Sequence, residues 1–151
     1  MRVIPAVLCL PLAFLAMMTS ATGSLGANAL GPRIGIVGSD EVFLGVQGEF
    51  GPAIGPATIV PSIDFGIGDG PATTANLDLR FYLIPLPETG IRFYGAAGPS
   101  IVFRDGSDLG LSLTLGLHIP MKKQRRYNLE YRWGIGDLPD HKIGFAVMFG
   151  L

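Results

Sequence analysis

The most constraining feature of this chain is a strict alternation of large apolar residues with small or polar ones. In Leu109–Ile119 every odd-numbered position is leucine or isoleucine, whereas the even-numbered positions carry glycine, serine, threonine and histidine. Ala75–Leu83, Tyr127–Trp133 and the C-terminal stretch Ile143–Leu151 show the same two-residue period. A period of two places successive side chains on opposite faces of a β-strand. The pattern therefore predicts strands with one apolar face and one polar face.

Turn-forming residues divide the chain from Gly31 onward into eight such segments. The separators are Gly38–Asp40, Gly51–Pro56, Gly68–Pro71, Pro85–Thr89, Asp105–Asp108, Met121–Arg126 and Gly136–Asp140. Short apolar segments at this spacing indicate an all-β fold. The first segment, Arg33–Val37, is short. Pro61 and Pro99 lie inside segments where each removes a backbone donor, so we expect bulges or strand ends there.

Charge and side-chain volume indicate which face points outward. Only 15% of the residues are charged, against about 25% in a typical soluble domain. The apolar face is rich in Leu, Ile and Phe, which would overfill the narrow interior of an eight-stranded barrel, whereas the small and polar face suits it. The sequence therefore predicts a closed up-and-down antiparallel transmembrane β-barrel of about eight strands. A soluble lipocalin-like ligand-binding barrel, with the apolar face inside, is the alternative.

This orientation assigns individual side chains to an environment. The residues expected to face lipid include Leu77, Leu79, Phe81, Leu111, Leu113, Leu115, Phe145 and Val147. The aromatic residues expected at the membrane interfaces include Phe93, Tyr127, Trp133 and Phe149. A polar network is expected in the lumen from Arg33, Glu49, Asp64, Asp78, Arg80, Arg92, Glu130 and Arg132, with Arg104 and Lys142 on the same face. Both positive and negative side chains occur, as is required if buried charges are to form pairs. Because the interior of an eight-stranded barrel is narrow, a packed polar plug is favoured over a lined pathway for a small solute.

The first residues have the pattern of a secretory signal peptide, predicted over residues 1–29, with the barrel domain over residues 30–151. Arg2 precedes the apolar run Val3–Met18, and Ala27-Asn28-Ala29 fits a small-residue cleavage site. Ala21 and Gly23 are earlier cleavage candidates, and a retained membrane anchor is the alternative. Cys9, the single cysteine, lies in this segment, so its removal leaves the mature chain without a thiol.

No catalytic, cofactor or metal site is expected. His118 and Glu130 lie on adjacent segments and are the one candidate acid–base pair, but no serine stands beside them in a nucleophile motif. Two histidines without cysteine give no metal-ligand spacing. The net charge of −1 and the lack of a long basic stripe argue against nucleic acid as a partner. The single charge run is Met121–Arg126. It could contact an anionic headgroup, a partner protein or only solvent.

Three stretches carry a resemblance to a known family: Phe93–Gly98 (FYGAAG), Asn128–Arg132 (NLEYR) and the alternating strand Ile143–Leu151. In these the chain resembles the small outer-membrane β-barrel superfamily that includes the OmpA transmembrane domain, OmpX and opacity-type adhesins. The resemblance implies a monomer in the bacterial outer membrane, and the signal peptide implies export through the periplasm. The resemblance also implies contact with outer-membrane lipids and lipopolysaccharide, and with the barrel-assembly machinery during biogenesis. Members usually end in an aromatic residue, whereas here Phe149 precedes the final Leu151.

The function expected from these observations is a structural or envelope role without catalysis. The alternative enzyme is of the outer-membrane lipid A deacylase type, which the chain resembles in size and in its Glu130-Tyr131-Arg132 strand. The His-x-Ser pairing of that enzyme is missing from the sequence.

Overall fold

The computed structural model describes residues 27–68, 72–139 and 141–151. The predicted signal sequence, with its cleavage candidates Ala21 and Gly23, lies outside the described residues. The described chain forms eight strands: β1 (Ala27–Val37), β2 (Glu41–Ile54), β3 (Ala57–Ile67), β4 (Thr73–Pro85), β5 (Arg92–Phe103), β6 (Ser107–Pro120), β7 (Arg125–Gly136) and β8 (His141–Gly150). Within these ranges, no helix has the length and apolar character needed to cross a bilayer.

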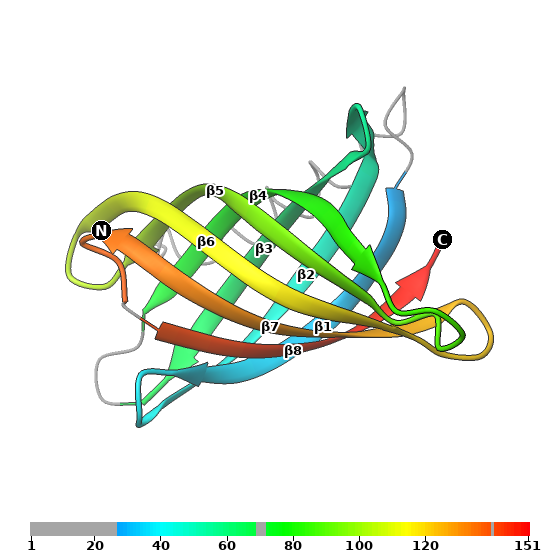
Figure 1. Cartoon of the computed structure of the whole chain (residues 1–151). Coiled ribbons are helices and arrows are strands. Elements are labelled where there is room, and N and C mark those ends of the chain that lie inside the picture. The colour runs from blue at the N-terminus through cyan, green and yellow to red at the C-terminus, as the bar shows by residue number, and fades with distance from the viewer. Residues whose placement is uncertain (1–26, 69–71, 140) are drawn as a thin grey trace.

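The strands form a closed barrel. Each strand pairs antiparallel with the next along the chain, and β8 pairs with β1 to complete the circle. Figure 1 shows tilted strands, with the C-terminus at the end that carries the β4–β5 and β6–β7 turns. We call this end the terminal rim, with turns at residues 55–56, 86–91 and 121–124, and the opposite end the distal rim, with residues 38–40, 104–106 and 137–139. The predicted eight-stranded up-and-down topology is confirmed.

Strand β1 begins earlier than the alternation of residues predicts. The sequence pattern indicated Arg33–Val37, whereas the strand starts at Ala27. Ala29 is buried in a cluster with Ala146 and Met148 of β8. Closure of the barrel explains the difference, because β1 gains backbone partners on both β2 and β8. These hydrogen bonds extend the strand through small residues that carry no local strand signal.

The expectation of bulges or strand ends at Pro61 and Pro99 is wrong. Both prolines lie inside continuous strands, and the register of β3 with β2 and of β5 with β4 is unchanged on either side of them. Each proline merely lacks a partner on one neighbouring strand. Residues of an antiparallel strand bond alternately to their two neighbours, so the missing donor interrupts one ladder and leaves the other in place.

Two lumen-facing glycines allow neighbouring strands to approach closely. A Cβ atom on Gly31 would lie 1.8 Å from the carbonyl oxygen of Val147, and one on Gly98 would lie 1.9 Å from that of Leu77. Such contacts involve backbone atoms, which do not move aside as a flexible side chain does. Glycine within a strand commonly marks a close backbone approach of this kind.

Candidate functional site

The two faces of the strands have opposite environments. On β6, Leu111, Leu113 and Leu115 are 55%, 46% and 51% exposed, whereas Ser112 and Thr114 between them are buried. The structure places all the residues assigned to lipid on the outside, exposed or half-buried: Leu77, Leu79, Phe81, Leu111, Leu113, Leu115, Phe145 and Val147. The interior is consequently not the apolar cavity that a lipocalin-type barrel requires.

Aromatic side chains lie near both ends of the apolar exterior. Phe93 and Phe149 are exposed and Tyr127 half-buried near the terminal rim. Tyr127 packs on Phe145, with ring centroids 5.3 Å apart. Trp133 lies farther along β7 toward the distal rim, 4.4 Å from the Tyr131 ring in an edge-on arrangement. That these rings occupy the membrane interfaces stays a prediction.

The barrel interior holds a charged cluster, which we call the ionic plug. Its buried members are four cations, Arg33, Arg80, Arg132 and Lys142, and four carboxylates, Glu49, Asp64, Asp78 and Glu130. The two sets carry equal and opposite formal charge. Since an unpaired buried charge is strongly destabilising, this balance is a condition for filling the lumen with ionic side chains.

Glu130 of β7 is the centre of the ionic plug. Arg33 Nη2 lies 3.2 Å from Glu130 Oε2, and Arg80 Nη2 lies 2.9 Å from Glu130 Oε1. The Tyr94 hydroxyl donates a 2.8 Å hydrogen bond to the same Oε1, and the Gln47 amide donates another of 3.2 Å. Strands β1, β2, β4 and β5 thus all contact one carboxylate on β7.

A second carboxylate, Glu49 of β2, links the centre of the plug to the terminal rim. Arg80 Nη1 lies 2.5 Å from Glu49 Oε1, so this guanidinium bridges Glu49 and Glu130. The Asn128 amide donates a 3.0 Å hydrogen bond to Glu49 Oε1, and Arg126 forms an ion pair with Glu49 Oε2. Arginine suits this bridging role because its planar fork presents several donors at once.

Two aspartates continue the plug toward the distal rim. Asp64 of β3 pairs with Lys142 of β8 and lies 3.2 Å from Arg33 Nε, and Asp78 of β4 lies 2.5 Å from Arg132 Nη2 of β7. Strands β4 and β7 are separated by two other strands around the barrel, as are β3 and β8. These ion pairs therefore cross the lumen and tie opposite walls together.

Two predicted interior cations lie outside the ionic plug. Arg92 is exposed at the terminal mouth, where its guanidinium carbon lies 5.3 Å from the Tyr82 ring centroid. Arg104 follows the end of β5 and pairs with Glu41 at 2.8 Å, on the distal rim. For both residues the predicted inner face is correct, but the predicted depth inside the barrel is wrong. Alternation assigns each residue to a face of the strand and does not locate the strand ends.

Sequence reasoning did not assign a role to the neutral partners of the plug. The ring of Tyr94 lies under the Arg80 guanidinium, at 4.1 Å from its centroid, and Lys142 Nζ lies 4.1 Å from the Phe43 ring centroid. Such cation–π contacts help to compensate buried cations. Both aromatic residues occupy the inward positions of their strands, so the alternation indicated their face but not their partners.

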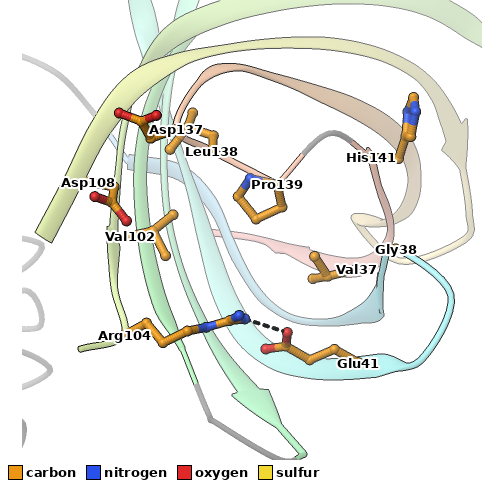
Figure 2. Close-up of a pocket in the computed structure, with 10 residues that line it drawn as sticks. All are labelled: Val37, Gly38, Glu41, Val102, Arg104, Asp108, Asp137, Leu138, Pro139 and His141. Carbon is orange, nitrogen blue, oxygen red and sulfur yellow. Dashed lines mark hydrogen bonds and ion pairs between the residues drawn. The ribbon is translucent and has the colours of Figure 1, made fainter. Parts of the chain in front are cut away.

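The distal mouth of the barrel is a vestibule of about 510 Å³. Figure 2 shows its charged wall, including the Arg104–Glu41 pair, with Leu138 and Pro139 between that pair and Asp137. Leu138 is buried against Ala72 and Val102. Leu138 and Pro139 also border a cavity of about 20 Å³ that Arg132 and Lys142 of the ionic plug help to line, so these two residues lie between this cavity and the vestibule.

The structure does not bring together the candidate acid–base pair. His118 Nδ1 lies 3.3 Å from the Tyr82 hydroxyl, whereas Glu130 is engaged by arginines and Tyr94. His141 is exposed on the distal rim, with Nδ1 at 2.6 Å from the Tyr131 hydroxyl. Among the described residues, no group of three or more His, Cys, Asp or Glu side chains is placed to hold a metal ion.

The structure of this chain is similar to solved β-barrel structures, although its sequence matches no known family. No known protein family matches the chain, and no curated protein is significantly similar to it in sequence. Among solved structures, the N-terminal β-barrel domain of Pseudomonas aeruginosa OprF aligns with a TM-score of 0.61 and 13% identity, over 83% of this chain and 100% of that one. A barrel from a study of de novo designed transmembrane β-barrels aligns with a TM-score of 0.60 and 12% identity, over 83% and 96%.

The chain has the fold of an eight-stranded transmembrane β-barrel. The resemblance to small outer-membrane barrels that the sequence suggested is thus confirmed for the fold. In a transmembrane β-barrel the exterior must be apolar and every strand edge must be paired. Both conditions hold here, since the outward leucines are exposed and β1 closes on β8.

Proposed function

We propose that this protein is an integral protein of the bacterial outer membrane with a structural or envelope role and no catalytic activity. The observation that carries the proposal is the inverted distribution of polarity, with four cations and four carboxylates buried in the lumen and leucine, isoleucine and phenylalanine exposed outside. In water such an exterior would be an aggregation hazard, whereas in a bilayer it is the stable arrangement.

The proposed state of the lumen is closed. Ion pairs join opposite walls at the level of Glu130 and Asp64, and the cavity of about 20 Å³ bordered by Arg132 and Lys142 has room for about one water molecule. A conducting barrel needs continuous water along its axis. We therefore expect no single-channel steps in planar bilayers containing the protein, and regular steps at neutral pH would contradict a closed lumen.

The proposed partners are the lipids of the outer membrane, lipopolysaccharide, and the barrel-assembly machinery during biogenesis, with the protein acting as a monomer. Export through the periplasm would remove the signal peptide predicted in residues 1–29. Because β1 includes Ala27–Ala29, cleavage at Ala21 or Gly23 would leave the strand whole, whereas cleavage after Ala29 would shorten it. N-terminal sequencing of the mature protein distinguishes these sites.

Heat-modifiable migration in detergent gels tests the proposal. A folded barrel keeps its strands paired in detergent, so we expect the unheated protein to migrate differently from the boiled protein. We also expect it to remain in the membrane fraction after carbonate extraction. Identical migration with and without heating, together with release by carbonate, would contradict a membrane barrel. Incubation with lipopolysaccharide should release no fatty acid, and release would favour the deacylase alternative.

A further inference from the structure

The terminal rim carries a cluster of cations that the ionic plug leaves largely unused. We call Lys122, Lys123 and Arg125 the basic turn. We propose that the basic turn binds the phosphate groups of anionic lipids in the leaflet that surrounds the terminal rim. This inference rests on the proposed membrane location and goes beyond it by naming a lipid-binding site.

The two rims have opposite charge. Besides the basic turn, the terminal rim carries Arg92, and Glu88 is the one acidic residue in its described turns. The described part of the distal rim and the strand ends beside it carry Asp40, Glu41, Asp105, Asp108 and Asp137 against two cations, Arg104 and the buried Lys142, which pairs with Asp64. An anionic ligand is therefore attracted to the terminal rim and repelled from the distal one.

The three side chains of the basic turn have no anionic partner within the described protein. Each is exposed, and the ion pairs of the described residues do not include them. The neighbouring Arg126 differs, because it points into the lumen and pairs with Glu49. Alternation along β7 explains the difference: adjacent residues point to opposite faces, so Arg125 points outward.

Backbone hydrogen bonds hold the basic turn against the strand ends. The Met121 amide donates to the Arg125 carbonyl at 2.8 Å, and the Gly150 amide of β8 donates to the Gln124 carbonyl at 2.8 Å. Lys123 and Gln124 adopt left-handed backbone conformations, with φ of 61° and 57°, which bend the chain within a few residues. The lysines therefore lie at the end of the barrel wall and do not extend far from it.

Along the outer surface of the barrel, apolar, aromatic and cationic side chains follow one another toward the basic turn, in the same order as the layers of a bilayer. Along β7 the outward residues are Leu129, then Tyr127, then Arg125 at the rim, and Arg125 is paired across the ladder with exposed Phe149. Hydrocarbon, interface and headgroup phosphate follow each other in the same order in a leaflet. This continuity favours a lipid phosphate over an acidic soluble partner, which would need no apolar surface beside the cations.

Spin-labelled lipids test the proposal directly. The protein is folded in phosphatidylcholine bilayers containing a trace of spin-labelled phosphatidylglycerol or phosphatidylcholine, and the motionally restricted fraction of each label is measured. We expect a preference for phosphatidylglycerol of about two- to threefold, decreasing at 0.5 M salt because charge attraction is screened. Equal restricted fractions for the two lipids would overturn the proposal.

Matched variants locate the site. The triple variant Lys122→Gln/Lys123→Gln/Arg125→Gln removes the three charges, and its preference for phosphatidylglycerol should disappear, with a ratio of about 1. The charge-conserving variant Lys122→Arg/Lys123→Arg/Arg125→Lys should retain the preference. Arg104→Gln, on the distal rim, should leave it unchanged. An unchanged preference in the glutamine variant would assign the selectivity elsewhere and overturn the proposal. If that variant does not fold, as judged by gel migration, the single variants Lys122→Gln and Lys123→Gln should each show a partial loss, and no loss in either would overturn it.

The experiment also separates this inference from the proposed function. If the protein does not enter the bilayer, neither label shows a restricted component, and the membrane location fails. If both labels show a restricted component of equal size, the barrel is in the membrane and only the basic-turn inference fails.

Discussion

Replacement of the central carboxylate tests whether the ionic plug stabilises the barrel. Glu130→Gln keeps the side-chain volume but removes one negative charge, leaving four buried cations against three carboxylates. The new amide group would also present a donor to Arg33 or Arg80, each of which now lies within 3.2 Å of a Glu130 oxygen. The variant therefore replaces attraction with donor–donor repulsion at the centre of the lumen.

The expected magnitude follows from the contacts of Glu130. Loss of one partner of a buried ion pair typically costs about 3–5 kcal/mol. Here Arg33 keeps Asp64, and Arg80 keeps Glu49, so each arginine retains one carboxylate. No cavity is created, because glutamine has nearly the same volume. We therefore expect the free energy of unfolding to fall by about 3 kcal/mol, the lower end of that range.

Urea unfolding of the protein in lipid vesicles measures this change, with Trp133, the single tryptophan, as the fluorescent reporter. Thr114→Val is the control, because Thr114 is buried in the lumen and its hydroxyl lacks a hydrogen-bond partner among the described residues. It should change the unfolding free energy by less than about 0.5 kcal/mol.

A double variant separates charge balance from local packing. Arg33→Gln combined with Glu130→Gln restores neutrality, and Asp64 keeps Lys142 as its partner. The double variant should lose less stability than the sum of the two single variants, by about 1–3 kcal/mol. A Glu130→Gln protein within about 0.5 kcal/mol of the wild type, or strictly additive single variants, would refute the argument that mutual neutralisation stabilises the plug.

The remaining predictions concern the outer face and the glycine contacts. Leu113→Arg, at an outward position in the middle of β6, should lower the free energy of unfolding in bilayers by about 2–4 kcal/mol, while Ser112→Thr on the inner face should matter much less. Equal effects in urea titrations would contradict the assignment of faces. Gly98→Ala should cost about 1–3 kcal/mol because its Cβ would collide with backbone, whereas Gly106→Ala has no atom within 4 Å of the new methyl group and should be nearly neutral in the same titrations.

Much of the architecture was predictable because strand alternation is a local property. The eight segments, their antiparallel order and the face of each side chain follow from residues a few positions apart. The turn clusters located the connections to within a few residues, although β2 continues to Ile54, past the predicted start of its turn. The longer β1 and the uninterrupted strands at Pro61 and Pro99 were not predictable, because backbone partners on other strands decide both.

The residue types in the ionic plug were predictable from the sequence, but the contacts between them were not. Alternation placed cations and carboxylates of both signs on one face, but it gave no means of pairing them. Arg92 shows the limit, since it has the inward parity of the plug residues and yet lies exposed at the end of β5. Depth along the barrel depends on strand tilt and register, which no short segment of sequence contains.

The sequence by itself determined that the strands have one apolar and one polar face, and that the polar face suits a narrow interior. The tertiary structure decided which charges neutralise one another. Arg33 and Glu130 are far apart along the chain and lie on β1 and β7, and only closure of β8 onto β1 brings them within 3.2 Å. Alternation depends only on residues that are neighbours in the sequence, whereas charge pairing across a lumen requires the whole circle of strands to close.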